Sequence, residues 1–130
     1  MTKQDISDWR VLIVDDEFDS IEVLMMVLTA SGAQVVYASN GVEGLALFKA
    51  ERPTLILTDL SMPEMDGWQM LNEIRRIDNN HHKTPVIALT AHAMAGDQEL
   101  VMKQGFDGYL SKPLKLFTLL DDLKQIVGKQ

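Results

Sequence analysis

The chain has 130 residues, contains no cysteine and carries 12 Lys and Arg against 19 Asp and Glu, a formal net charge of −7. This length fits one domain, the lack of cysteine excludes a disulfide framework and a cysteine-ligated zinc site, and the acidity disfavours binding to the phosphate backbone of nucleic acids. No apolar run approaches the roughly 20 residues of a membrane-spanning helix, and Met1–Trp9 has no apolar core of a signal peptide, so we expect one cytoplasmic domain with no membrane or direct nucleic-acid partner.

Five short segments, most of them rich in Val, Ile, Leu or Tyr, predict β-strands. In chain order they are Arg10–Val14, Gln34–Ala38, Thr54–Thr58, Pro85–Leu89 and Gly108–Leu110. The first, third and fourth are almost continuously apolar, which is typical of strands buried on both faces of a parallel sheet.

Longer stretches with helical spacing lie between the strands and after the last one. The expected apolar stripes are Ile21, Leu24 and Leu28; then Met70, Leu71, Ile74 and Ile77; then Leu116, Leu120, Leu123 and Val127. Gly32 is expected near the end of the first helix, and Gly67 is expected to allow a tight entry into the third. Five strand–helix repeats predict right-handed crossovers and a doubly wound parallel sheet.

Polar residues end the predicted strands. The first ends in Asp15 and Asp16, the third in Asp59, the fourth in Thr90, and Lys112 follows the fifth. Because binding sites in open α/β sheets form at the carboxyl ends of the strands, these side chains are expected at one edge. Singly, each has a plainer interpretation: an Asp or Thr there often caps a helix, and a Lys is usually a solvated charge.

Together these residues favour chemistry on phosphoryl groups. Crowded carboxylates repel one another unless a cation, a proton or a lysine relieves the repulsion. An all-oxygen cluster suits a hard ion such as Mg²⁺. An ion and an ammonium group can neutralise phosphoryl oxygens while a carboxylate acts as the nucleophile.

Four motifs carry a resemblance to a known family. They are VLIVDD at Val11–Asp16, LILTDLSMPEMDG at Leu55–Gly67, PVIALTA at Pro85–Ala91 and YLSKP at Tyr109–Pro113. In this order the chain resembles the receiver domains of two-component response regulators, the CheY-like superfamily. We therefore predict a single receiver domain over residues 1–130, with a core of about 9–127. Its fold would be α/β, with a five-stranded doubly wound parallel sheet in the flavodoxin-like order 2-1-3-4-5 and five helices on both faces.

The resemblance implies a role for each site residue. Asp59 would accept a phosphoryl group from a histidine of a sensor histidine kinase or a histidine phosphotransfer protein. Asp15, Asp16, Asp59 and the backbone carbonyl of Ser61 would hold Mg²⁺ (or Mn²⁺). Lys112 would contact the phosphoryl oxygens, with a cis peptide bond before Pro113.

The resemblance also implies a switch. Thr90 would bind the aspartyl phosphate and Tyr109 would turn inward in response. A partner protein would then bind the face made by the fourth helix, fifth strand and fifth helix, and a homodimer is a further possibility. Such a protein is a phosphoacceptor that assists its own phosphorylation and slow dephosphorylation, and not a turnover enzyme.

Three other functions fit parts of this pattern. A phosphohydrolase similar to haloacid dehalogenases needs a second Asp two residues after the nucleophile, where this chain has Ser61. An FMN carrier of the flavodoxin type would find its phosphate repelled by Asp15, Asp16 and Glu17. The third alternative is a degenerate receiver that docks partners without phosphorylation. The presence of every expected site residue argues against it.

Two further hypotheses concern residues near the site. Ser61 and His92 either help to set the phosphoryl lifetime by steering water or simply point to solvent. Met25 and Met26, which lie off the first apolar stripe, together with Val23 either form a docking patch or are only partly buried.

Overall fold

In a computed structural model, residues 6–78, 83–91 and 95–128 are described. Five strands alternate with five helices, as predicted. The strands are β1 (Arg10–Val14), β2 (Gln34–Ala38), β3 (Leu55–Asp59), β4 (Val86–Thr90) and β5 (Gly108–Ser111). The helices are α1 (Phe18–Ala30), α2 (Gly41–Glu51), α3 (Gly67–Ile77), α4 (Ala95–Lys103) and α5 (Leu119–Gly128).

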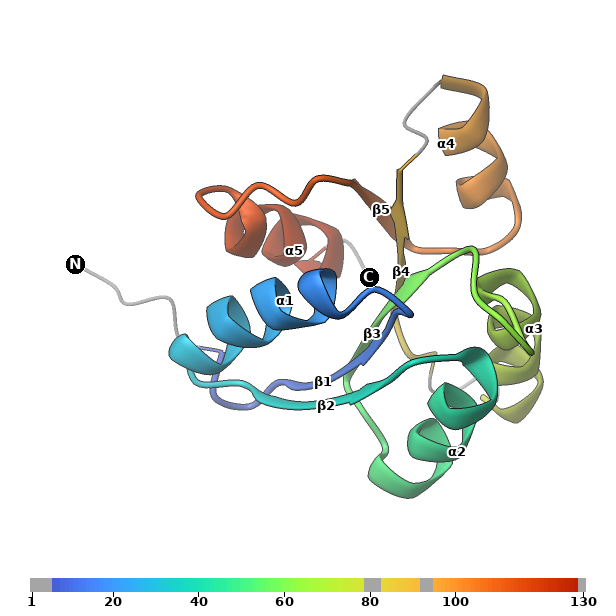
Figure 1. Cartoon of the computed structure of the whole chain (residues 1–130), viewed down its shortest axis with the longest axis horizontal. Coiled ribbons are helices and arrows are strands. Elements are labelled where there is room, and N and C mark those ends of the chain that lie inside the picture. The colour runs from blue at the N-terminus through green and yellow to red at the C-terminus, as the bar shows by residue number, and fades with distance from the viewer. Residues whose placement is uncertain (1–5, 79–82, 92–94, 129–130) are drawn as a thin grey trace.

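The strands form one parallel sheet in the order β2-β1-β3-β4-β5, which confirms the predicted topology. Helices α1 and α5 lie on one face, and α2, α3 and α4 lie on the other (Figure 1). Alternation along the strands explains both layers, because successive side chains point to opposite faces. Val11 and Ile13 of β1 pack in the core beneath α1 and α5, whereas Leu12 and Val14 pack toward α2 and α3.

Three strand ends differ from the predicted ones by one residue. Strand β3 runs to Asp59, β4 to Thr90 and β5 to Ser111. Thr54 lies just before β3 and bonds the backbone of Arg10: its amide donates to the Arg10 carbonyl at 2.7 Å, and its hydroxyl accepts from the Arg10 N–H and donates to the same carbonyl. Asp59 and Thr90 are thus the last residues of their strands, held by the sheet itself.

Two of the predicted apolar stripes need correction. Ile77 ends α3 and is exposed. Leu116 is also exposed, because α5 begins only at Leu119, and the buried residues of α5 are Leu119 and Leu123. The chain turns before that helix, where the Thr118 amide donates to the Lys115 carbonyl at 3.3 Å. The stripe Ile21, Leu24 and Leu28 is buried as predicted.

Glycine is needed at the start of α3 because two backbone segments approach closely. A Cβ placed on Gly67 would lie 2.3 Å from the carbonyl oxygen of Asp59. The N–H of Gly67 donates to the carbonyl of Leu60 at 3.0 Å. The loop between β3 and α3 is therefore folded back against the end of β3. Gly32, in contrast, follows α1 with a φ of +105°, a conformation that costs glycine little.

An ion-pair network ties α3 to the opposite, amino-terminal edge of β4 and to β5. Arg75 donates to Asp107 Oδ2 at 2.8 Å and to the carbonyl of Thr84 at 2.7 Å. The same Asp107 oxygen accepts from the amide of Val86 at 2.8 Å, and Lys83 lies 3.2 Å from Oδ1. The Asp107 side chain is only 4% exposed, so this carboxylate is a buried hub of the fold.

No helix among the described residues is long and apolar enough to cross a membrane.

Candidate functional site

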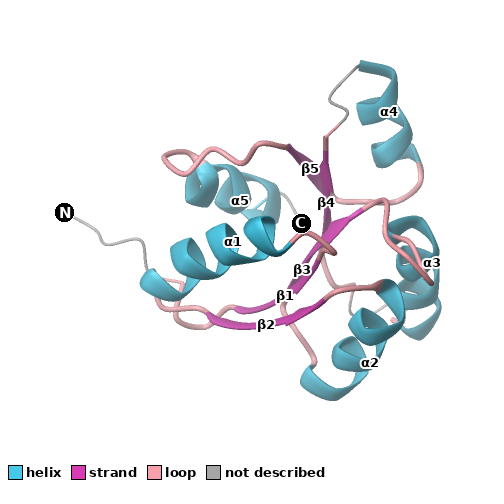
Figure 2. Ribbon diagram, viewed as in Figure 1, coloured by secondary structure: helices cyan, strands magenta, loops and turns pink. Residues whose placement is uncertain are grey.

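The site lies at the carboxyl edge of the sheet, where neighbouring parallel strands end together. Asp15 follows β1, Asp59 ends β3, and Lys112 follows β5. The loops that lead from these strands to α1, α3 and α5 leave the same edge (Figure 2). The sheet thus brings together residues that are up to 97 positions apart, as the sequence predicted.

Asp15 is buried in the loop after β1, and its two carboxylate oxygens have different surroundings. Oδ1 accepts the amide N–H of Glu17 at 2.9 Å, which closes a short turn two residues on. Among the described residues, Oδ2 accepts no hydrogen bond of good geometry, although Lys112 Nζ forms an ion pair with it at 3.0 Å. Asp15 therefore does not cap α1, whose N-cap residue is Glu17: one of its oxygens bonds the Glu17 amide, and the other is directed at Lys112.

Lys112 lies among three carboxylates. Its Nζ is 2.6 Å from Glu17 Oε1, 3.0 Å from Asp15 Oδ2 and 3.4 Å from Asp59 Oδ2. The Lys112 side chain is 11% exposed, so it is not the solvated charge that a lone surface lysine would be. A cis peptide bond joins Lys112 to Pro113, as the resemblance implied.

Burial and charge shift the pKa values of these groups in different directions. Burial raises the pKa of the Asp15 carboxyl to about 6, since the Glu17 amide and Lys112, which favour the carboxylate, offset only part of that cost. Lys112 lowers the pKa of Glu17 by hydrogen bonding to it. Burial would lower the pKa of Lys112, but its contacts with Glu17 and Asp15 outweigh burial and raise it.

Glu17 belongs to this cluster, although no motif in the sequence indicates a role for it in phosphoryl chemistry. Oxygens of Asp15, Glu17 and Asp59 lie within 4.8 Å of one another, and Asp16 is not part of this group. The chain bends at Asp16, and the bond from the Glu17 amide to Asp15 Oδ1 holds Glu17 beside Asp15. The position of Glu17 two residues after an Asp, within reach of such a turn, is the signal that could have identified it. Asp16 is exposed, and its role as a ligand stays a prediction.

The Asp59 carboxylate is also held by the loop that follows it. Oδ1 accepts the amide of Leu60 at 2.7 Å and that of Ser61, less closely, at 3.4 Å. Oδ2 faces Lys112, whose Nζ lies 3.4 Å away. One oxygen of Asp59 is therefore fixed by backbone amides, and the other is directed toward the cation.

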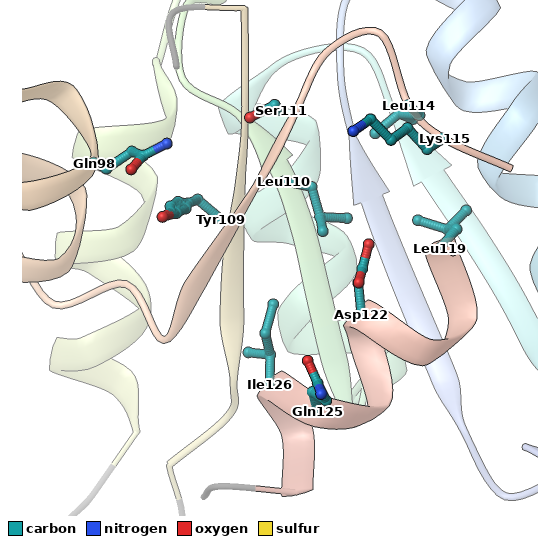
Figure 3. A pocket seen from close by; sticks show the side chains of 10 residues that line it. All are labelled: Gln98, Tyr109, Leu110, Ser111, Leu114, Lys115, Leu119, Asp122, Gln125 and Ile126. Carbon is teal, nitrogen blue, oxygen red and sulfur yellow. The ribbon is translucent and has the colours of Figure 1, made fainter. Parts of the chain in front are cut away.

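The two predicted switch residues lie on the neighbouring strands. Thr90 is buried at the end of β4, paired in register with Ser111 of β5, and its carbonyl accepts the amide of Lys112 at 2.8 Å. Tyr109 of β5 is half-buried, and Figure 3 shows its side chain directed toward Gln98 of α4. Thr90 is thus connected by backbone to the site lysine, and Tyr109 lies beyond it on the face shared with α4.

Outside this site, the two methionines of α1 differ from each other. Met25 packs partly against the core, whereas Met26 is 59% exposed. Both line an apolar groove of about 680 Å³, with Phe18, Val23 and Tyr37 among its other residues. Partial burial therefore describes Met25, Met26 is exposed, and a docking role for this surface stays a prediction. His92 lies outside the described residues.

We predict that Asp15→Asn stabilises the metal-free protein. The native pKa of about 6 exceeds the ordinary value of 3.8, so the folded state binds more protons between these values and stability falls as pH rises through that range. At pH 7.5 the variant should gain about 1–3 kcal/mol in free energy of unfolding, since 1 pKa unit corresponds to about 1.4 kcal/mol and Lys112 loses one partner. Below about pH 4 the gain should disappear, because Asp15 is then protonated in both states.

Urea unfolding at the two pH values, with a chelator present, measures this difference. Asp16→Asn is the matched control, because Asp16 is the exposed neighbour and its loss should change stability by no more than about 0.5 kcal/mol. An Asp15→Asn variant that is destabilised equally at both pH values would contradict the effect of burial on this carboxyl.

Comparison with known proteins agrees with this geometry. The family model of the response regulator receiver domain matches residues 11–124. The polar-differentiation response regulator DivK of Brucella anthropi is 35% identical over 118 residues, which cover 91% of this chain and 95% of DivK. The sensor histidine kinase GacS of Pseudomonas protegens is 38% identical over 107 residues, which are 81% of this chain and 12% of that much longer protein.

A solved structure gives the same result in three dimensions. The receiver domain of the sensor histidine kinase PA1611 from Pseudomonas aeruginosa PAO1 superposes with a TM-score of 0.79 at 32% identity, covering 92% of this chain and 98% of that one. That structure is described with a magnesium ion coordinated in its active-site cleft. Sequence, sheet topology and site geometry therefore agree, and this chain belongs to the response regulator receiver domain family.

Proposed function

We propose that this receiver takes up a phosphoryl group on Asp59 from a phosphohistidine of a sensor histidine kinase or a histidine phosphotransfer protein, in a reaction that requires Mg²⁺ or Mn²⁺. The observation that carries this proposal is the state of the Asp59 carboxylate. One oxygen is fixed by the amides of Leu60 and Ser61, and the other faces Lys112 with a contact of only 3.4 Å. Such a carboxylate is oriented but still available as a nucleophile.

The transfer is a displacement at phosphorus. Asp59 Oδ2 forms a new P–O bond as the bond from phosphorus to the histidine nitrogen breaks. The electron pair of that bond returns to the imidazole ring, which takes up a proton. Lys112 and the Thr90 hydroxyl would donate to the phosphoryl oxygens, because preorganised donors stabilise charge that spreads over these oxygens.

The residues present fit a hard divalent cation. Two of the assigned ligands, Asp15 and Asp59, have oxygens within 4.8 Å of each other, and Glu17 adds negative charge beside them. Among the described residues, the buried Oδ2 of Asp15 accepts no hydrogen bond of good geometry. Oxygen ligands with retained waters are what Mg²⁺ prefers. We assign the ion to Asp15, Asp16, Asp59 and the carbonyl of Ser61. When bound, it would neutralise the negative charge that accumulates on the phosphoryl oxygens.

The proposed reaction is stoichiometric, so the domain would be a signalling acceptor and not a turnover enzyme. A phosphohydrolase would need an acid or base group beside the acceptor, and Ser61, two residues on, is no such group. A receiver that only docks partners would not need the ion pairs of Lys112 with Asp15 and Asp59. Phosphorylation gives each of these residues a role.

The groove along α1 is a suitable surface for the phosphodonor. Its apolar floor includes Met26 and Val23, and acidic Asp19 and Glu22 line it as well. Phe18 lies at the start of α1, next to Glu17 of the carboxylate cluster. A donor with an apolar, positively flanked surface would therefore be held beside the acceptor site.

Output would use the face formed by α4, β5 and α5. A pocket of about 330 Å³ lies there, with Tyr109 and Gln98 on one side and Asp122 and Ile126 of α5 on the other (Figure 3). A phosphoryl group adds about −1.5 to −2 charges at Asp59. Its attraction for Thr90 would favour an inward Tyr109, and the change in this pocket would shift the affinity for a downstream protein.

Metal dependence provides the test of the proposed function. After incubation with acetyl phosphate and Mg²⁺, intact mass should show a single phosphoryl adduct on the protein. With a chelator in place of Mg²⁺ the adduct should be lost, because the carboxylates would then repel the incoming phosphoryl group. An adduct that forms equally well without divalent metal would contradict the assigned role of the cluster. No adduct, with or without a phosphohistidine donor, would favour the docking-only receiver.

A further inference from the structure

The shortest contact of the site lysine is with a residue outside the proposed reaction. Lys112 Nζ lies 2.6 Å from Glu17 Oε1, compared with 3.0 Å and 3.4 Å for its contacts with Asp15 and Asp59. Hydrogen bonds between charged groups at this distance are among the stronger ones in proteins. The ammonium group of Lys112 therefore uses one of its three N–H donors to bind Glu17. Glu17 is neither the phosphoryl acceptor nor one of the assigned metal ligands.

Glu17 also differs from the other two carboxylates in its surroundings. Its side chain is 62% exposed, whereas those of Asp15 and Asp59 are 0% and 13% exposed. The ion pair joins the loop after β1 to the loop after β5, 95 residues apart. Glu17 gives no side-chain cap to α1, so its carboxylate is left to hold Lys112.

This arrangement has a consequence for phosphoryl transfer. A Lys112 donor held by Glu17 is not available to the oxygens of a phosphoryl group on Asp59. We propose that Glu17 is a positioning residue that holds Lys112 in the resting state, so that the Glu17–Lys112 ion pair slows phosphorylation of Asp59 and its removal speeds the reaction. The inference rests on the proposed function, because it concerns the rate of that reaction.

The test compares wild type with Glu17→Gln at saturating Mg²⁺ for each protein, so that a change in metal affinity does not enter. Phosphorylation by acetyl phosphate, followed by intact mass, should be about two- to fivefold faster in the variant, the factor that a partly exposed ion pair is worth. In the metal-free proteins, NMR should show faster exchange of the Lys112 ammonium protons with water. A residue that only supports the fold would not change that exchange.

Two further variants separate the ion pair from simple charge repulsion. Glu51→Gln removes an exposed charge from the end of α2, at the other edge of the sheet, and should leave both rate and exchange unchanged. Glu17→Asp keeps the charge but shortens the side chain, so its phosphorylation rate should rise to the extent that its Lys112 exchange rises. Faster exchange in Glu17→Gln without faster phosphorylation, or unchanged exchange in Glu17→Gln, would overturn the inference. If wild type takes up no phosphoryl group, the proposed function fails with it; if only the variant effect is missing, this inference alone fails.

Discussion

Replacing Asp107 by alanine will lower the free energy of unfolding by about 3–5 kcal/mol, the cost of removing one partner from a buried ion pair. One Asp107 oxygen accepts from both the Arg75 guanidinium and the Val86 amide, each at 2.8 Å. Without it, the buried amide loses its partner and Arg75 keeps a charge that is only 23% exposed. The beginnings of β4 and β5 and the end of α3 would lose their common anchor together.

Urea unfolding with Glu73→Ala as the matched control measures this loss. Glu73 pairs with Arg76 on the same helix at 2.9 Å, but Arg76 is 74% exposed, so the control should lose no more than about 1 kcal/mol. Asp107→Asn, which keeps an acceptor for the Val86 amide, should fall between the two. Equal losses in the Asp107→Ala and Glu73→Ala variants would show that the network does not anchor these elements.

Asp59→Asn will abolish phosphoryl uptake while preserving the fold. The amide side chain has nearly the same shape and can still accept the Leu60 N–H that Asp59 Oδ1 accepts at 2.7 Å. It lacks a carboxylate, however, so no acyl phosphate can form at this position. The phosphoryl adduct in intact mass should therefore fall below detection, and the circular dichroism spectrum should remain that of wild type.

The control for this variant is Asp19→Asn, which removes the same single negative charge. Asp19 lies on α1, where it lines the groove of that helix and is not part of the carboxylate cluster. It should take up phosphoryl from acetyl phosphate at the wild-type rate. An adduct of unchanged yield in Asp59→Asn would mean that another residue is the acceptor.

The fold was largely predictable from the sequence, because the pattern that specifies it is local. The apolar runs of β1, β3 and β4 are buried from end to end, and the polar residues after them lie at the carboxyl edge as expected. Predictions failed where a local pattern did not decide the structure. Leu116 continues the apolar spacing of α5. Because the chain turns before this helix, however, α5 begins only at Leu119 and Leu116 is exposed.

Side-chain partners across the fold were less predictable than the sheet. The roles of Asp59 and Lys112 came from motifs, but the contact between Glu17 and Lys112 depends on two loops that meet only in the folded protein. The same holds for Arg75 and Asp107, which are 32 residues apart and whose pairing no motif indicates. Spacing specifies a strand or helix; it does not specify which of several neighbouring carboxylates a lysine will choose.

The most direct test of the central claim is to map the phosphoryl group to a residue. After phosphorylation with acetyl phosphate and Mg²⁺, borohydride reduction converts an aspartyl phosphate into homoserine, which peptide mass spectrometry can locate. We expect homoserine at position 59 and nowhere else, in a yield that matches the phosphoryl adduct of the intact protein. Homoserine at Asp15 or Asp16, or a phosphoryl group that resists borohydride on a hydroxyl or imidazole side chain, would contradict the assignment of Asp59 as the acceptor.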